Sequence, residues 1–357
     1  MNLNINHLLK EVLKRKASDL HLVAGAEPMF RVDGEILTGG RVKLSAENIK
    51  ELVYQIMQPR QIKLLENSSC VEFTYTLPGT GRFRLNVHLQ RGTIAAAIRL
   101  IPSTVGSLEE LNLPSILRNI ALQHRGLILV TGPAGSGKST TLAAMVNIIN
   151  ETRRVHIITI EDPIEYLHNH KLALVEQIEV GGDIPSFAQA LKYALRQDPD
   201  VILVGEMRDL ETVSLALTAA ETGHLVMATL HTPDAPQAIN RIIDVFPEQQ
   251  QNQIRSQLSL SLRNVICQQL LPKRGGGRVP ACEILTVTPA VANLIRKNKI
   301  DQIYTMIETG STSGMISLRQ SLEVLVEKGL VHWRHALENA ERYVDDLGEW
   351  LEKRGYR

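Results

Sequence analysis

The sequence is poor in cysteine and in aromatic residues. Its 357 residues include three cysteines, Cys70, Cys267 and Cys282, and no two of them form a C-x2-C pair. This spacing excludes a disulfide framework, disfavours a tetrahedral zinc site and is typical of a protein from a reducing compartment. Aromatic residues make up 4% of the chain, which disfavours a stacking channel for single-stranded nucleic acid.

The sequence also lacks an excess of charge of one sign and a long hydrophobic run. The formal net charge is +1, so no strong overall field attracts nucleic acid or anionic lipid, and partners must be recognised locally. The apolar runs fall short of the roughly 20 residues that span a bilayer, and residues 1–4 carry no secretory pattern. We therefore expect a cytoplasmic protein, with peripheral docking on a membrane complex left open.

The first third of the chain is predicted to form a small α/β domain. Apolar and polar residues alternate without a break over residues 82–90, which predicts a strand with one face in a core and one face presented outward. Further strands are predicted at residues 19–23, 70–76 and 93–101, a helix at 7–16, and turns within 31–35 and 77–81. Pro102 ends this pattern, and we place the domains at residues 1–105 and 106–357.

The second domain is predicted to contain a parallel sheet covered by helices on both faces. Strand-like apolar runs occur at residues 127–131, 156–160, 201–205 and 225–230, and they alternate with helical segments. The S-x-x-Q spacing that begins at Ser186 predicts a helix to about Arg196. After residue 250 we expect helices, the last two at residues 317–328 and 334–353 with Gly329 between them; about 285–357 form the helical end.

A complete phosphate-binding loop follows the first of these strands. Its G-x4-G-K-S pattern consists of Gly132, Pro133, Ala134, Gly135, Ser136, Gly137, Lys138 and Ser139, followed by Thr140. Glycines let backbone N–H groups surround a β-phosphate, the lysine reaches the β- and γ-phosphate oxygens, and the serine hydroxyl binds Mg²⁺. A helix that begins at the loop adds its positive end. The sequence therefore predicts binding of a nucleoside triphosphate.

Acidic residues follow the next two strands of the predicted sheet. Glu161 and Asp162 come after the second strand and Glu206 after the third. In open α/β sheets, ligands bind beyond the carboxyl ends of the strands. Hydrolysis needs one carboxylate near the metal and another near the attacking water. We assign Glu206, with Ser139, to Mg²⁺, Glu161 to the water and Asp162 to support; the reverse assignment of the two glutamates stays open.

Two histidines flank the fourth strand. We predict that His224 and His231 sense the γ-phosphate from the edge of the sheet. The alternative for each histidine is a helix cap or a hydrogen bond at a strand end. A metal site is disfavoured, because no third ligand with suitable spacing accompanies them.

Charge on a transferred phosphoryl group is often balanced by an arginine from a neighbouring subunit. The candidates are Arg82 and Arg84, on the polar face of the strand at 82–90, with Arg99 nearby. The alternative for this face is simple solvation. Arg208, just after Glu206, is a candidate from within the same domain.

Taken together, these motifs resemble those of the bacterial secretion ATPase superfamily, most closely its type IV pilus retraction ATPases. The matching segments are the Walker A loop at 132–139, an Asp box at 160–166, Walker B at 200–206, a His box at 222–231 and an N-terminal segment at 17–22. The resemblance implies a PAS-like N-terminal domain, a RecA-like ATPase domain, and a homo-hexameric ring with ATP and Mg²⁺ at its subunit boundaries.

Within the superfamily, extension and type II secretion ATPases carry an added N-terminal domain and usually a four-cysteine metal element. This sequence opens on the PAS-like segment and has a glycine-rich turn after residues 268–274, which favours retraction. The C-terminal motif of the retraction family is altered here at residues 290–297, whose last position is Lys297. That departure leaves an accessory retraction ATPase as an alternative.

The resemblance also implies partners: a platform protein of the inner-membrane pilus base, where the ring would bind peripherally, and a paralogous ATPase. Two other function classes remain open. A nucleic-acid translocase also uses hexameric phosphate-loop domains, but it needs a basic or aromatic channel, and we expect no nucleic-acid partner. A non-hydrolysing scaffold has no chemical need for Glu161, Asp162 and Glu206 together.

Overall fold

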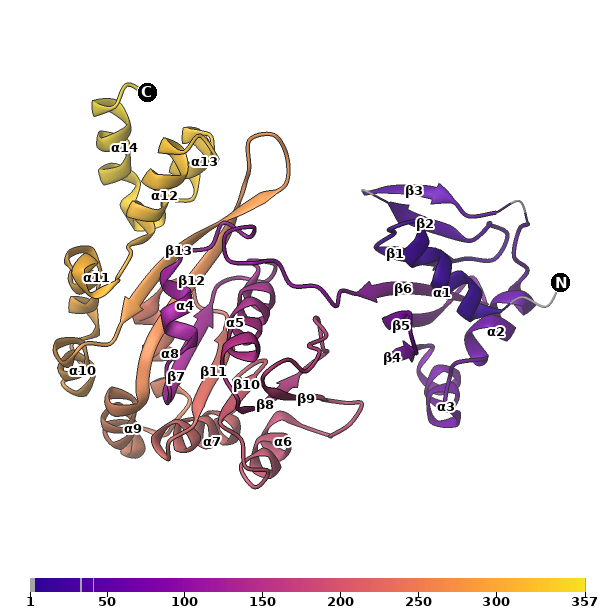
Figure 1. Ribbon diagram of the computed structural model, residues 1–357, viewed down its shortest axis with the longest axis horizontal. Coiled ribbons are helices and arrows are strands. Elements are labelled where there is room, and N and C mark those ends of the chain that lie inside the picture. Colours follow the sequence, from indigo (N-terminus) through magenta and orange to yellow (C-terminus); the bar gives the residue numbers. More distant parts are fainter. Residues whose placement is uncertain (1–3, 33, 41, 357) are drawn as a thin grey trace. The chain divides into compact units, whose positions relative to one another are not determined.

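The computed structural model describes residues 4–32, 34–40 and 42–356. The chain divides into two compact units, residues 1–104 with 165–167, and residues 105–164 with 168–357. Each unit contains one β-sheet with helices packed against it (Figure 1). The predicted α/β class is confirmed.

The first unit is built on a six-stranded antiparallel sheet in the order β3-β2-β1-β6-β5-β4. Its strands are β1 (Asp19–Leu22), β2 (Met29–Val32), β3 (Glu35–Thr38), β4 (Cys70–Leu77), β5 (Gly81–Gln90) and β6 (Thr93–Ile101), and its helices are α1 (Ile5–Lys14), α2 (Ala46–Tyr54) and α3 (Pro59–Ser68). Part of the predicted turn at 31–35, residue 33, lies outside the described residues.

Strand β5 has the two faces that its alternating sequence predicts. Phe83, Leu85 and Val87 are completely buried and pack in the core with residues of α1 and α2. Arg82 and Arg84 lie on the other face of the sheet, because successive side chains of a strand point to opposite sides. The same alternation therefore builds the core and presents a polar surface.

The second unit is built on a seven-stranded sheet in the order β13-β12-β7-β11-β10-β8-β9. All neighbouring pairs are parallel except β12 with β13. The strands are β7 (Gly126–Thr131), β8 (His156–Glu161), β9 (Leu174–Glu179), β10 (Val201–Val204), β11 (Leu225–Leu230), β12 (Leu262–Pro272) and β13 (Arg278–Thr286). The predicted strands at 127–131, 156–160, 201–205 and 225–230 are thus found as four neighbours of one sheet.

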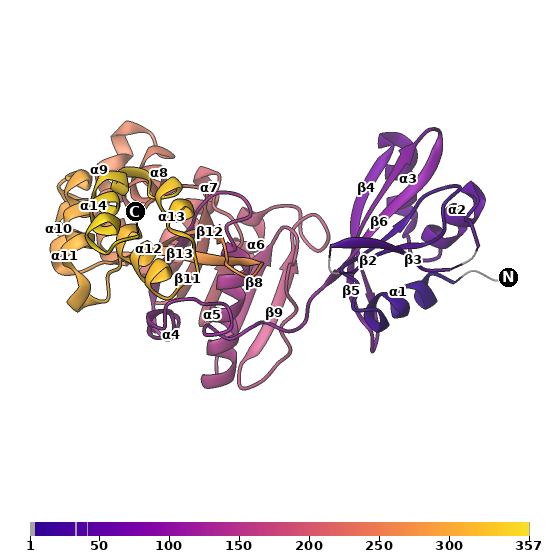
Figure 2. The ribbon, with the colours of Figure 1, turned by 90° about the horizontal axis from the view of Figure 1, so that it is seen from above.

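Helices cover both faces of this sheet, as Figures 1 and 2 show. Ile128 and Val130 of β7 pack in one core with α4 (Ile116–Ala121) and α5 (Lys138–Thr152). Leu127 and Leu129 pack in a second core with α6 to α9. The helices of that face are α6 (Phe187–Ala194), α7 (Leu210–Glu221), α8 (Ala235–Asp244) and α9 (Glu248–Ser261). Because both faces are covered, the central strands β7, β10 and β11 are apolar at nearly every position.

The prediction that the chain is helical after residue 250 is wrong for residues 262–286. Helix α9 ends at Ser261, and Leu262 is already extended, so β12 begins with no turn between the two elements. The hairpin of β12 and β13 closes through Gly275, Gly276 and Gly277, all with positive φ. The strand is stabilised by pairing with β7, about 135 residues earlier in the chain, and local sequence does not report that contact.

The C-terminal segment contains α10 (Pro289–Arg296), η1 (Ile300–Gln302), α11 (Ile303–Thr309), η2 (Ser311–Ser313), α12 (Leu318–Glu327), α13 (Trp333–Glu338), η3 (Glu341–Tyr343) and α14 (Val344–Lys353). The predicted continuous helix at 334–353 is wrong, because it breaks between α13 and η3. Leu271 and Val279 of the β12–β13 hairpin pack in a small core with α12, α13 and α14, which lie beside the hairpin in Figure 1. Among the described residues, no helix has the length and apolar character needed to cross a bilayer.

Candidate functional site

The phosphate loop has the backbone conformation that an anion cradle needs. Gly135 and Gly137 have φ of 77° and 89°, in the left-handed region that favours glycine. At Gly132, φ is 142° and a Cβ would lie 2.2 Å from the backbone oxygen of Gln268. Glycine is therefore required there by close approach of β12, and the loop leads directly into α5.

Lys138 and Ser139 occupy the first turn of α5. Lys138 is 9% exposed, and its Nζ donates to the backbone oxygens of Gly132 and Pro133, at 2.8 and 2.9 Å. Ser139 and Thr140 are half-buried beside it, whereas Ala134 is exposed. A buried ammonium group, flexible glycines and the positive end of a 15-residue helix fit a bound phosphate chain.

Glu206 lies at the same edge of the sheet, just after β10. Its Oε1 accepts a hydrogen bond from Arg208 Nε, and His231 Nε2 lies 3.1 Å from the same oxygen. Hydrogen bonding to Glu206, with a smaller contribution from the charge of Asp162, raises the pKa of the Arg208 guanidinium above its ordinary value. Glu206 and His231 come from neighbouring strands, β10 and β11, so the fold brings together two of the predicted site residues.

Glu161 ends β8, next to the start of the Glu206 segment. Gly205 allows this proximity, because a Cβ there would lie 3.0 Å from the Ile160 oxygen and 3.3 Å from Glu161 Cα. Glu161 Oε1 accepts hydrogen bonds from Thr159 Oγ1 at 2.7 Å and from Gln177 Nε2 at 3.2 Å. Asp162, the next residue, is exposed. The roles of Glu161, Asp162 and Glu206 stay predictions.

Strand β9, which was not predicted from the sequence, supports Glu161 and the chain that follows it. The amide of Gln177 donates to Glu161, and its Oε1 accepts from the backbone N–H of His168 at 2.8 Å. Glu179 Oε2 accepts from the backbone N–H of Ile164 at 3.3 Å. The irregular alternation of residues 174–179 was the available signal for this edge strand.

His168 lies in the loop before β9 and is half-buried. Burial, and to a smaller extent the charge of Lys171, lowers its pKa from 6.5 to about 4. The imidazole is therefore neutral at physiological pH.

The structure does not place His224 with the other site residues. His224 precedes β11, whereas His231 follows it, and six strand residues separate two positions by roughly 20 Å. His224 Nδ1 lies 3.0 Å from the Ala219 oxygen and 3.3 Å from Thr222 Oγ1, at the end of α7. This is the helix-cap alternative, so the structure gives no support to γ-phosphate sensing by His224 from this strand edge.

The three candidate arginines of the first unit share one face of its sheet. Arg84 and Arg99 are directly opposite each other in the β5–β6 register. Arg84 Nε pairs with Glu72, Arg99 Nε lies 2.8 Å from Asp19 Oδ1, and Arg82 donates to Thr74 Oγ1 at 2.8 Å. Arg99 remains 69% exposed at its side chain. Their action on a neighbouring subunit stays a prediction.

A pocket of about 310 Å³ opens beside the start of α5. Gly137, Thr140 and Thr141 form its phosphate-loop side. The remaining lining is a mixture of apolar and polar groups: Glu110, Leu111, Asn112, Leu113, Gln268, Leu270, Arg278 and Pro280. A pocket of this character and position has the chemistry to hold a base and a ribose next to the phosphate loop.

In the part of the chain that the structure describes, no cluster of three or more His, Cys, Asp and Glu side chains is arranged to bind a metal by itself.

Comparisons with known proteins agree with this geometry. The family described as Type II/IV secretion system protein matches residues 1–338. The type IV pilus retraction ATPase PilT of Pseudomonas aeruginosa is 50% identical over 339 residues, which cover 95% of this chain and 98% of PilT. The type IV pilus ATPase PilU of the same organism is 41% identical over 336 residues, which cover 94% of this chain and 88% of PilU.

A solved structure shows the same fold. The crystal structure of the pilus retraction motor PilT with bound ADP superposes with a TM-score of 0.87 at 48% identity, over 95% of this chain and 97% of that chain.

Proposed function

Because this chain belongs to the Type II/IV secretion system protein family, we propose that it is the ATP-hydrolysing motor of type IV pilus retraction. The observation that carries the proposal is its similarity to PilT over nearly the whole length of both chains. The site supports it independently, because a phosphate loop, two glutamates and a histidine lie at the carboxyl ends of β7, β8, β10 and β11.

ATP is the proposed substrate. Lys138 turns from its loop carbonyls to the β- and γ-phosphates, and the backbone of residues 135–139 surrounds the β-phosphate. The base lies in the pocket beside Thr140 and Leu270. Mg²⁺ held by Ser139 and Glu206 would neutralise charge that develops on the phosphate oxygens.

Glu161 orients the attacking water and accepts its proton. Its carboxylate is fixed by Thr159 and Gln177, which keeps it directed from the end of β8. His231 and Arg208 hold the Glu206 carboxylate. The chain thus keeps two carboxylates in different settings for the two roles that hydrolysis requires.

The active form is proposed to be a homo-hexamer at the cytoplasmic side of the inner-membrane pilus base, where it engages a platform protein and works beside a paralogous ATPase. Arg82, Arg84 and Arg99 of one subunit act on the phosphates bound by the next. Closing and release of this contact during hydrolysis move the domains and drive pilus disassembly.

An accessory role like that of PilU is the second candidate, and the altered residues 290–297, which form most of α10, favour it. The lower identity to PilU than to PilT weighs against it. Retraction by this chain without a paralogue would exclude the accessory role.

The proposed activity is tested by ATP hydrolysis of the purified chain beside Lys138→Ala. We expect Mg²⁺-dependent turnover by the wild type and a loss of roughly 100-fold or more in the variant, since the charge that binds the phosphates is removed. Single-stranded DNA should leave the rate unchanged. Equal rates for the two proteins would contradict the proposal, and stimulation by DNA would favour a translocase.

A further inference from the structure

Two consecutive glutamines of β12 make equivalent hydrogen bonds on opposite sides of the strand. Gln268 Nε2 donates to the backbone oxygen of Ser136 at 2.7 Å, and Gln269 Nε2 donates to the backbone oxygen of Asn339 at 2.8 Å. Adjacent strand residues point to opposite faces. Gln268 therefore reaches the phosphate loop, whereas Gln269 reaches the end of α13.

Gln268 holds the loop at two points. Its Oε1 accepts a hydrogen bond from Thr141 Oγ1 at 2.7 Å, so one amide group joins the carbonyl of Ser136 to the first turn of α5. The side chain is 4% exposed, and both hydrogen bonds are buried. A buried carbonyl that loses its donor costs the full desolvation penalty of that group.

Gln268 also lies very close to two glycines of the loop. The backbone oxygen of Gln268 would be 2.2 Å from a Cβ at Gly132, and its side-chain Nε2 would be 2.8 Å from a Cβ at Gly137. The two glycines that bound the loop thus both face this one residue. Its amide has both a donor and an acceptor in use, and glutamate, although similar in shape, has no N–H to donate.

We infer that Gln268 is a positioning residue that keeps the phosphate loop in its nucleotide-binding shape and so sets nucleotide affinity. This inference rests on the proposed nucleotide site. The hydrogen bond from the Gln268 amide holds the Ser136 carbonyl in one direction, and this keeps the N–H groups of the loop available to the phosphate. Without that hydrogen bond, part of the binding energy is used to order the loop.

The test compares Gln268→Glu with Gln269→Glu, which removes the same kind of N–H···O=C bond one residue away. We measure ADP affinity by calorimetry and the KM and kcat for ATP. Gln268→Glu should weaken ADP binding roughly tenfold or more and raise KM with little change in kcat, since saturating ATP restores the loop. Gln269→Glu should bind ADP as the wild type does.

Other outcomes would overturn the inference. A fall in kcat with unchanged KM and ADP affinity would mean a general loss of folded protein, and equal weakening by the two variants would place the effect in the hairpin as a whole. If Gln268→Glu does not fold, Thr141→Val, which removes the hydroxyl donor to Gln268, must weaken ADP binding in the same direction, and unchanged binding would refute the role. If the wild type itself bound no ADP, the proposed nucleotide site would fail instead.

Discussion

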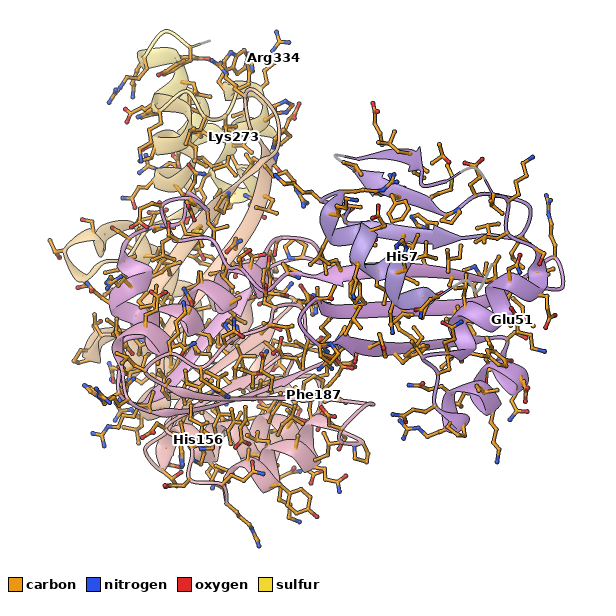
Figure 3. All side chains as sticks on the ribbon, turned by 45° about the vertical axis from the view of Figure 1, so that its right-hand side comes forward. His7, Glu51, His156, Phe187, Lys273 and Arg334 are labelled. Carbon is orange, nitrogen blue, oxygen red and sulfur yellow. The ribbon has the colours of Figure 1, made fainter. Side chains whose placement is uncertain are left out.

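In the seven-stranded sheet, the amino ends and the carboxyl ends of the strands carry the same kinds of residues, but these residues have different partners. At the amino ends of the strands, His156 Nδ1 lies 3.0 Å from the Gln197 oxygen, which can only accept, the backbone N–H of His156 donates to Asp200, and His224 Nδ1 lies 3.0 Å from the Ala219 oxygen. At the carboxyl ends, His231 and Arg208 meet the side chain of Glu206. His156, which Figure 3 labels, is the first residue of β8.

The difference shows how position on a parallel sheet separates structural from functional polar groups. At the amino ends, His156 and His224 contact backbone oxygens of turns and helix ends, and the contact of the His156 ring with a side chain, from Nε2 to Glu176 Oε1 of β9, is longer, at 3.4 Å. At the carboxyl ends, side chains from separate strands meet one another near the phosphate loop, where ligands bind in this fold class. The presence of a histidine in the sequence therefore predicts neither a structural nor a functional role.

The largest expected effect on hydrolysis comes from a change at the carboxyl ends of the strands. Glu206→Gln keeps the shape of the side chain but removes the charge that His231 and Arg208 contact. We expect kcat for ATP to fall roughly 100-fold, because stabilisation of the reacting phosphate by a fixed charge is lost. Steady-state hydrolysis measures this. Glu176→Gln, which removes the carboxylate beside His156 near the amino ends, is the matched control, and a comparable loss of kcat there would break the comparison.

His168 sharpens the comparison, because it follows the carboxyl end of β8 but is half-buried and has a lowered pKa. Its pKa in the folded protein is about 4 against an ordinary 6.5, so protonation favours the unfolded chain. Its neutral form contributes full stability above pH 6.5, and that stability is lost as the pH falls towards 4. At pH 5 the loss is about 2 kcal/mol. Thermal unfolding should show a steeper acid loss for the wild type than for His168→Phe; parallel pH profiles would contradict the burial effect.

The smallest effect distinguishes His224 and His231, which flank β11. His231→Ala removes a partner of Glu206 and should lower kcat roughly tenfold. His224→Ala removes the contact with the end of α7 and should lower the free energy of unfolding by about 1 kcal/mol while kcat stays unchanged. Hydrolysis rates and thermal unfolding of both variants check this, and a fall in kcat for His224→Ala would show that the amino edge takes part in the reaction.

The central strands of this sheet could be predicted from sequence because both of their faces are buried. β7, β8, β10 and β11 are nearly continuous apolar runs, and each ends at a polar segment. The phosphate loop was likewise predictable, since its glycines and lysine act through local backbone geometry. These features depend on residues that are close together in the chain.

Other features depend on contacts between distant segments, and sequence did not reveal them. β12 is a strand because it pairs with β7 and β13, and the role of Gln268 exists only because that pairing brings it to Ser136. The same limit applies to His224, since the motif at 222–231 contains both histidines but the strand between them separates their side chains. Pairing of β12 also places Asn339 against Gln269, near the break in the predicted C-terminal helix.

Pilus retraction in cells that carry this chain, or its Glu206→Gln variant, as their only retraction ATPase tests the central claim most directly. Retraction is measured from the force or speed of surface-attached pili, with matched protein levels. We predict retraction with the wild type and none with the variant. Retraction by both, or by neither while the purified wild type hydrolyses ATP, would contradict the assignment of this chain as the retraction motor.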